Sequence, residues 1–176
     1  MARRSAGAAT KTDSERRPRF TVRPATLGDA EPLAKLAGQL GYPSSPDEVK
    51  RRLEQILVRP EHRVFVAEAR GAQAGEGLAG WVHAYVVRTV ESDPSVEIGG
   101  LVVEESWRGR GLGRLLMAEA ERWARTTDCA AVTLRSNVVR DGAHAFYRRL
   151  GYTLIKTQRV FRKAILAGDS TATSTH

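Results

Sequence analysis

The chain of 176 residues has a formal net charge of +8 and a single cysteine. This length suits one globular domain with a hydrophobic core. A lone cysteine excludes an intrachain disulfide and a thiolate metal cluster, which favours a reducing, cytoplasmic setting. No apolar run approaches the roughly 20 residues that cross a bilayer, and the N-terminus lacks the apolar block of a secretion signal, so we expect a soluble protein without a membrane partner.

The two ends of the chain differ from its middle in composition. Residues 1–19 hold six arginine or lysine residues, and both ends have little apolar content or periodicity. We therefore expect a disordered basic arm over 1–18, a single folded domain over 19–165 and a disordered polar tail over 166–176. The arm also has the composition of a transit peptide, but its two acidic residues, Asp13 and Glu15, count against that interpretation.

The N-terminal half of the expected domain predicts one strand, two helices and a hairpin. An alternating pattern over 20–26 is typical of a strand, and apolar residues spaced three and four apart predict helices over 29–40 and 47–57. Two further β-rich runs, 62–69 and 78–88, flank a glycine-rich connection and predict a hairpin.

The C-terminal half predicts an alternation of strands and helices. Strands are expected over 95–103 and, buried, over 129–135. Each is followed by a helix, the second of which ends at Gly151, and residues 152–164 predict strand, turn and strand. The order of elements places the chain in the α/β class with mixed α+β character.

Three glycines and three arginines lie together in the stretch SWRGRGLGRLL, residues 106–116, between a predicted strand and a predicted helix. A glycine-rich turn at a helix start suits a phosphate, because backbone N–H groups converge there and the helix dipole favours an anion. A dinucleotide fingerprint would need glycine where Arg114 stands, and no P-loop Gly-Lys followed by Ser or Thr is present. The remaining pattern is Arg108-x-x-Gly111-x-Gly113.

This pattern is similar to the pyrophosphate loop of the GNAT superfamily of acyl-CoA-dependent N-acetyltransferases, which reads Arg/Gln-x-x-Gly-x-Gly/Ala between a strand and a long helix. The preceding EIGGLVV resembles the fourth strand of the family, and AHAFYRRLGY resembles its tyrosine-bearing helix. The resemblance covers about Phe20 to Lys163. It implies a GNAT-like mixed, mostly antiparallel sheet, with six to seven strands and about four flanking helices.

The resemblance also implies acetyl-CoA as the acyl donor, without a metal. Pantetheine would pair like an extra strand with the backbone of Leu101, Val102 and Val103, where the fourth strand splays from the fifth. The adjacent Gly99 and Gly100 either form a bulge that opens this splay or meet a packing need for a small residue. Backbone N–H groups of the loop and first helical turn would bind the pyrophosphate, helped by the charges of two arginines; the positions are Arg108, Gly109, Arg110, Gly111, Leu112, Gly113 and Arg114.

Arg114 and two further candidate cofactor contacts, Asn137 and Tyr147, each have an alternative interpretation. Arg114 can equally lie on the exposed helix surface without a ligand. Many family members have an asparagine seven residues before the helix tyrosine, but Arg140 stands there in this chain. Asn137, three residues earlier, would bind the cofactor only through a longer turn. Tyr147 matches the family tyrosine that protonates the coenzyme A thiolate and would also touch the cofactor; the alternative is a core tyrosine.

Glu97 is the candidate general base, because it lies on the strand leading into the loop, where several family members carry a glutamate. It could instead pair with a surface arginine or bind the substrate amine without proton transfer. His83 and Tyr85, which alternate with Trp81 on the preceding strand, either line an acceptor pocket or form an ordinary sheet face. The free Cys129 is not expected to relay the acetyl group.

The acceptor region is expected in the two N-terminal helices, their linker and the C-terminal hairpin. These segments lack the dense acidic cluster that a polycationic aminoglycoside would favour. Tyr42 and Glu48 could help bind a modest amine, although Glu48 could simply lie on the helix surface. Nucleic acid is not expected as a partner, because interleaved exposed aromatic residues and a recognition helix are missing.

We therefore expect an N-acetyltransferase that moves the acetyl group of acetyl-CoA directly to a primary amine of a small molecule in a ternary complex. The alternatives are a protein or peptide N-acetyltransferase and a non-catalytic regulator that binds acyl-CoA. Homodimers are common in the family, so the resemblance also allows a homodimer.

Overall fold

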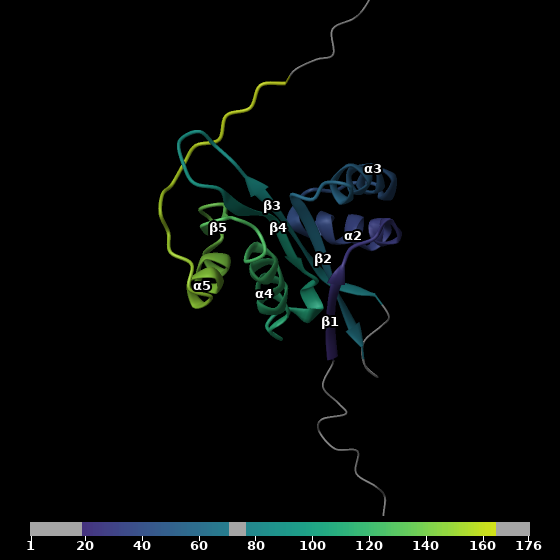
Figure 1. Ribbon diagram of the computed structural model, residues 1–176. Coiled ribbons are helices and arrows are strands. Elements are labelled where there is room, and N and C mark those ends of the chain that lie inside the picture. The colour runs from purple at the N-terminus through teal and green to yellow at the C-terminus, as the bar shows by residue number, and fades with distance from the viewer. Residues whose placement is uncertain (1–18, 71–76, 165–176) are drawn as a thin grey trace, which may run out of the picture. The chain divides into compact units, whose positions relative to one another are not determined.

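The computed structural model describes residues 19–70 and 77–164 (Figure 1). The expected basic arm over 1–18 and polar tail over 166–176 lie outside the described residues. The chain divides into two compact units, Met1–Val138 and Val139–His176, and each is described by itself. The single domain over 19–165 stays a prediction.

The first unit is built on one five-stranded sheet. Its strands follow one another in the order β1-β2-β3-β4-β5, so each lies beside its neighbour in the chain. All pairs are antiparallel except β4 with β5, which is parallel. The sheet is therefore mixed and mostly antiparallel, as predicted, with five strands in the described residues in place of six to seven. The strands are β1 (Arg19–Pro24), β2 (His62–Arg70), β3 (Leu78–Val87), β4 (Ser95–Val103) and β5 (Ala131–Leu134).

Three α-helices accompany this sheet, and local sequence signals set their ends. Helix α2 (Ala30–Leu40) ends at Gly41, whose φ of +96° is a left-handed conformation that suits glycine. Helix α3 (Pro46–Leu57) begins with a reciprocal cap between Ser45 and Glu48. Helix α4 (Leu112–Ala124) follows the glycine stretch. Two short 3₁₀ turns, η1 (Leu27–Asp29) and η2 (Glu105–Trp107), precede α2 and α4.

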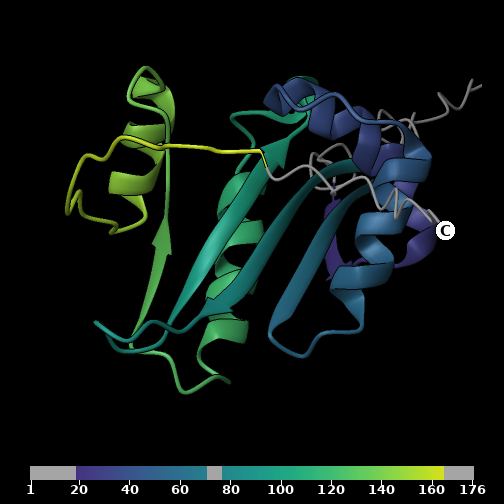
Figure 2. The ribbon, with the colours of Figure 1, turned by 90° about the horizontal axis from the view of Figure 1, so that it is seen from above.

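The helices cover the two faces of the sheet. Helices α2 and α3 pack on one face, and α4 lies against the other (Figures 1 and 2). The α4 helix approaches closely at Gly80, where an added Cβ would lie 3.1 Å from Leu116 Cδ1. No helix in residues 19–70 or 77–164 is long and apolar enough to cross a membrane. The core beneath α2 and α3 contains Ala25, Ala30, Leu33, Leu53, Val64 and Val66, while α4 buries Leu112, Leu116, Met117 and Ala120.

A partly buried ion pair fixes the start of α2. Both carboxylate oxygens of Asp29 accept hydrogen bonds from Arg23, each at 2.8 Å, and one also accepts from the Thr26 backbone N–H at 2.7 Å. Arg23 Nε donates to Glu68 on β2 at 2.7 Å. The first two strands and the entry to α2 are thereby joined through one guanidinium group.

The second unit contains helix α5 (Asp141–Arg149). Gly151 follows it with a φ of +92°, and the Tyr152 backbone N–H donates to the Tyr147 carbonyl oxygen at 3.1 Å. The predicted strand, turn and strand over 152–164 is wrong, because these residues form neither helix nor strand. Alternating apolar residues favour a strand, but a strand needs a neighbouring strand to pair with, and residues 139–164, the described part of this unit, contain no strand.

Candidate active site

Strand β4 has a partly unpaired edge. It pairs with β5 only from Ser95 to Ile98, opposite Ala131 to Leu134. From Gly99 to Val103, β4 has no partner on the β5 side within the described residues. Strand β5 itself is half-buried and spans four residues, shorter and less buried than predicted. Within the described residues, Leu101, Val102 and Val103 are therefore not paired with β5, and the expected splay of the two strands there stays a prediction.

A bulge lies in β4 at the point where this edge begins. Across the β3–β4 pair, His83 lies opposite Gly100 and Ala84 lies opposite Ile98, so Gly99 is an extra residue on β4. An added Cβ would lie 2.8 Å from Tyr85 Cε1 at Gly99, and 2.8 Å from the Trp81 ring at Gly100. The glycine pair therefore forms a bulge and makes room for aromatic rings, whereas opening of the splay by this bulge stays a prediction.

The loop between β4 and α4 adopts conformations that require glycine. Gly109 has a φ of +75° and Gly111 a φ of +84°, while an added Cβ at either would meet nothing within 4 Å. Backbone conformation, not crowding, therefore selects glycine here. Gly111 is the N-cap of α4, and its carbonyl accepts the Leu115 N–H at 3.2 Å. The N–H groups of Leu112, Gly113 and Arg114 precede that first helical bond and have no intrahelical partner.

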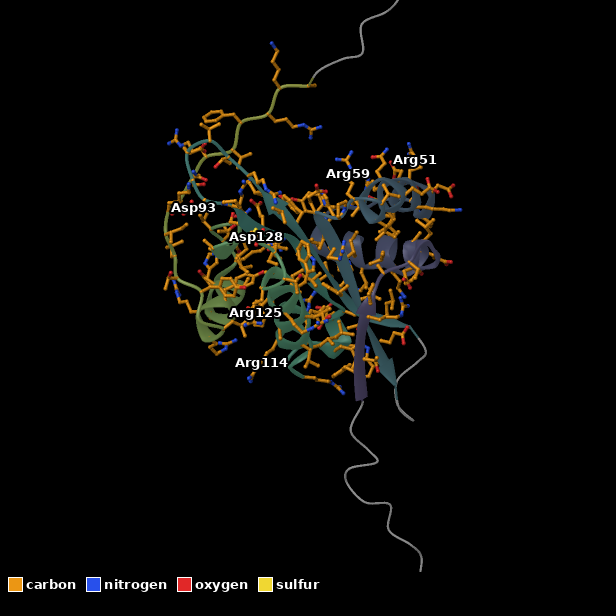
Figure 3. All side chains as sticks on the ribbon, viewed as in Figure 1. Arg51, Arg59, Asp93, Arg114, Arg125 and Asp128 are labelled. Atoms are coloured by element: carbon orange, nitrogen blue, oxygen red, sulfur yellow. The ribbon has the colours of Figure 1, made fainter. Side chains whose placement is uncertain are left out.

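The arginines of the loop differ in their surroundings. Arg108 Nε donates to the Val103 carbonyl oxygen at 3.1 Å, and its guanidinium lies 3.8 Å from the Glu105 carboxylate. The Arg110 guanidinium stacks over the Trp107 ring at 4.9 Å. Arg114 is exposed and extends outward from the start of α4 (Figure 3). Arg108 and Arg110 are thus held beside the loop, whereas Arg114 is free to sample solvent.

Glu97 lies at the centre of a polar cluster on the α2–α3 face. It is only 8% exposed, and one carboxylate oxygen accepts a hydrogen bond from Arg135 at 3.1 Å. Tyr85 lies directly opposite Glu97 in the β3–β4 register. Burial and the neighbouring Glu97 carboxylate raise the pKa of Tyr85. The predicted alternative of a pair with a surface arginine is confirmed by geometry; the role of Glu97 as a base stays a prediction.

Two histidines extend this cluster. His62 Nδ1 and His83 Nε2 are 3.1 Å apart, and the rings of His62, His83 and Tyr85 have pairwise centroid distances of 5.3 to 5.4 Å. Burial, helped by the nearby His62, lowers the pKa of His83 to about 4. Burial and the charge of Arg59 lower the pKa of His62 as well. Both rings are therefore neutral near pH 7.

Sequence reasoning missed His62 and Arg135. The alternation of the predicted hairpin could have found His62, because pairing of His62 with Tyr85 puts it on the same face as His83. Arg135 directly follows β5, one residue beyond the pairing of Ile98 with Leu134. Its contact with Glu97 depends on that register, which the sequence alone leaves open.

The other predicted residues lie elsewhere. Asn137 comes after β5, near the end of the first unit, and Tyr147 belongs to α5 in the second unit. Burial raises the pKa of Tyr147, and its ring contacts Tyr152 at a centroid distance of 6.1 Å. Tyr42 is 70% exposed after α2. Glu48 accepts from the Ser45 backbone N–H at 2.8 Å and so caps α3.

Comparison with known proteins shows which family this chain resembles in sequence. The model of the acetyltransferase (GNAT) family matches residues 30–152. An aminoglycoside N(6')-acetyltransferase type 1 of Stenotrophomonas maltophilia is 36% identical over 141 residues, which cover 80% of this chain and 89% of that protein.

Solved structures show the same fold. The aminoglycoside N-acetyltransferase AAC(6')-Iy in complex with CoA has a TM-score of 0.73 at 23% identity, over 85% of this chain and 98% of that one. AAC(6')-Iy with the bisubstrate analogue CoA-S-monomethyl-acetylneamine has a TM-score of 0.71 at 22% identity, over 84% and 99% of the two chains. Together with the family match, which spans both units, they lead to one conclusion. The chain belongs to the acetyltransferase (GNAT) family and is an acetyl-CoA-dependent N-acetyltransferase.

Proposed function

We propose that this enzyme transfers the acetyl group of acetyl-CoA directly to a primary amine of a small molecule, at the unpaired edge of β4. The observation that carries this proposal is the position of that edge, which runs directly into η2 and the glycine loop at the start of α4. Free strand backbone next to open helix N–H groups suits a ligand that joins an amide chain to a pyrophosphate.

The loop and the strand would each hold one part of the acyl donor. The N–H groups of Gly109 to Arg114 would donate to the pyrophosphate, and the positive charges of Arg108 and Arg110 add complementarity. Leu101 to Val103 would pair with the pantetheine amides. The Val103 carbonyl already accepts from Arg108, so this arginine orders the point where the strand meets the loop. Asn137 is a further contact proposed for the cofactor.

Two residues would handle the protons of the reaction. Acetyl-CoA supplies a thioester, and the amine must lose a proton before it can attack. Glu97 would accept that proton, directly or through water, because its carboxylate is the buried acidic group beside the expected splay. Tyr147 would donate its phenolic proton to the leaving sulfur, and burial, which raises its pKa, keeps that proton in place at neutral pH.

Relatives guide the choice of acceptor. The Stenotrophomonas relative is an aminoglycoside N(6')-acetyltransferase by name, so aminoglycosides with a 6'-amine are the first acceptors to test. The exposed face of α3 mixes charges of both signs: Arg51 and the nearby Arg59 project outward, and Asp47 and Glu54 are exposed on the same helix (Figure 3). Such a mixed surface does not demand a polycation. Polyamines, amino acids and peptide N-termini therefore belong in the same panel.

Calorimetry with acetyl-CoA and thiol release across this amine panel would test the proposal. We expect acetyl-CoA to bind and at least one small amine to release free coenzyme A. Release with peptides alone would point to the peptide acetyltransferase alternative. Binding without release for any amine would favour a regulator, and absence of binding would refute the assignment of the glycine loop.

A further inference from the structure

We propose that His83 positions the acceptor amine at the β4 bulge by accepting a hydrogen bond through Nδ1, and that His62 fixes the tautomer that makes this possible. The inference rests on the proposed function, in which acetyl transfer takes place at this part of the sheet.

His83 lies where the bulge gives access to its ring. It stands opposite Gly100, and an added Cβ on the neighbouring Gly99 would lie 3.4 Å from His83 Nδ1. Gly99 therefore places no side chain over this nitrogen. Glu97 is on the same face, linked to His83 through the Tyr85 ring between them. Two hydrogen-bond acceptors, an imidazole nitrogen and a carboxylate, thus flank one stretch of β4.

The second ring nitrogen of His83, Nδ1, lies on the side of the bulge. Among the described residues, Trp81 Nε1 is the one fully buried side-chain nitrogen or oxygen without a hydrogen-bond partner. Within residues 19–70 and 77–164, the hydrogen bond of the His83 ring is made through Nε2, and Nδ1 lies toward Gly99, which has no side chain. Nδ1 is consequently available to a ligand, whereas Nε2 is engaged with His62.

The contact between the histidines selects a tautomer. A neutral imidazole has one donor and one acceptor nitrogen, so the 3.1 Å contact between His83 Nε2 and His62 Nδ1 requires one N–H and one lone pair. If His83 donates, both rings carry the proton on Nε2, which is the intrinsically favoured tautomer of histidine. The reverse direction would need the less favoured tautomer in both rings. His83 Nδ1 is then a lone pair facing the bulge.

Charge also suits an amine at this position. A protonated imidazole would repel an ammonium group and could not accept its hydrogen bond, whereas burial keeps the His83 ring neutral at physiological pH. The paired Glu97 and Arg135 nearly cancel each other beside it. Recognition of the amine would therefore come from directed hydrogen bonds, with His83 setting its direction and Glu97 receiving its proton.

Steady-state kinetics on matched variants would test this role. His83→Phe removes the acceptor but keeps a flat ring, and we expect the KM for the amine to rise about ten- to a hundredfold while the KM for acetyl-CoA stays within about twofold. His83→Asn places an amide oxygen near the Nδ1 position and should restore most of the lost affinity. His62→Asn keeps an acceptor near its Nδ1, whereas His62→Gln does not, so only the glutamine variant should raise the amine KM.

Nitrogen-15 NMR of the histidine rings gives a readout independent of turnover. We expect the neutral imidazole ring of His83 to carry its proton on Nε2, and we expect His62→Gln to reduce that preference. A proton on Nδ1 of His83, or an unchanged amine KM in folded His83→Phe, would overturn the inference. If the wild-type enzyme acetylates no amine in the panel, the proposed function fails. The NMR spectrum is independent of turnover and would still show whether His83 carries its proton on Nε2, as inferred, or on Nδ1.

Discussion

Replacement of Gly111 by alanine isolates the conformational requirement of the glycine loop. The φ of Gly111 is +84°, and an added Cβ would meet nothing within 4 Å, so the methyl group brings backbone strain without a steric clash. The left-handed conformation costs a non-glycine residue roughly 1–2 kcal/mol. If the loop keeps its shape, that amount is lost from folding stability; if it relaxes, the N–H groups turn away from the pyrophosphate and affinity falls.

Gly38→Ala provides the matched control. Gly38 lies within α2, and an added Cβ there also meets nothing within 4 Å, but its φ is not in the left-handed region. Alanine is favoured over glycine in a helix by roughly 1 kcal/mol, so this variant should be stabilised. Replacement of glycine by alanine is thus expected to stabilise the protein at position 38 and to destabilise it at position 111.

Urea unfolding and acetyl-CoA calorimetry would measure both effects. We expect Gly111→Ala to lose about 1–2 kcal/mol, divided between unfolding free energy and binding free energy, and Gly38→Ala to gain stability with unchanged affinity. Gly111→Glu, which adds a negative charge at the same point, should weaken acetyl-CoA binding further. A Gly111→Ala protein with wild-type stability and wild-type affinity would refute the reasoning.

Three further predictions concern the proton-handling residues and the α2 anchor. Glu97→Gln should lower kcat by about 10²- to 10⁴-fold while the calorimetric affinity for acetyl-CoA is retained, and normal turnover would remove Glu97 as the base. Tyr147→Phe should lower kcat in thiol-release assays with acetyl-CoA affinity largely spared; full activity would remove it as the acid. Asp29 has a pKa lowered mainly by its hydrogen bonds with Arg23. Its contribution to stability is therefore complete above its ordinary value of 3.8 and is lost as the pH falls through the lower folded-state value. Unfolding midpoints of Asp29→Asn and wild type should accordingly differ at pH 7 and converge on acidification, whereas a constant difference would contradict the ion-pair account.

Local sequence patterns predicted much of the fold. The glycines at 109 and 111 and the apolar spacing after them located the loop between β4 and α4 and the start of α4, because such signals lie within a few residues of one another. The helices before β2 followed from apolar spacing and from turn residues at their ends. Identification of the family came from the same local signals, read in their order along the chain.

Long-range geometry could not be predicted in the same way. The contact of Arg135 with Glu97 and that of His62 with His83 depend on strand registers, and a shift of one residue would have moved each side chain to the opposite face. Residues 152–164 alternate like strands, yet alternation supplies no pairing partner. The cap of α3 is different, because the local Ser45-x-x-Glu48 pattern is itself a capping signal, which sequence reasoning missed.

The unpaired edge of β4 has a consequence for the protein before it meets its substrate. Exposed strand backbone is a template for any other extended chain, and proteins normally shield it with a charge, a proline or a covering segment. Here the bulge at Gly99 distorts the edge, and Arg108 occupies the Val103 carbonyl at its end, which makes it a poor match for a flat strand of another molecule. The features proposed to admit a narrow amide chain would therefore also disfavour pairing of this edge with a strand of another molecule.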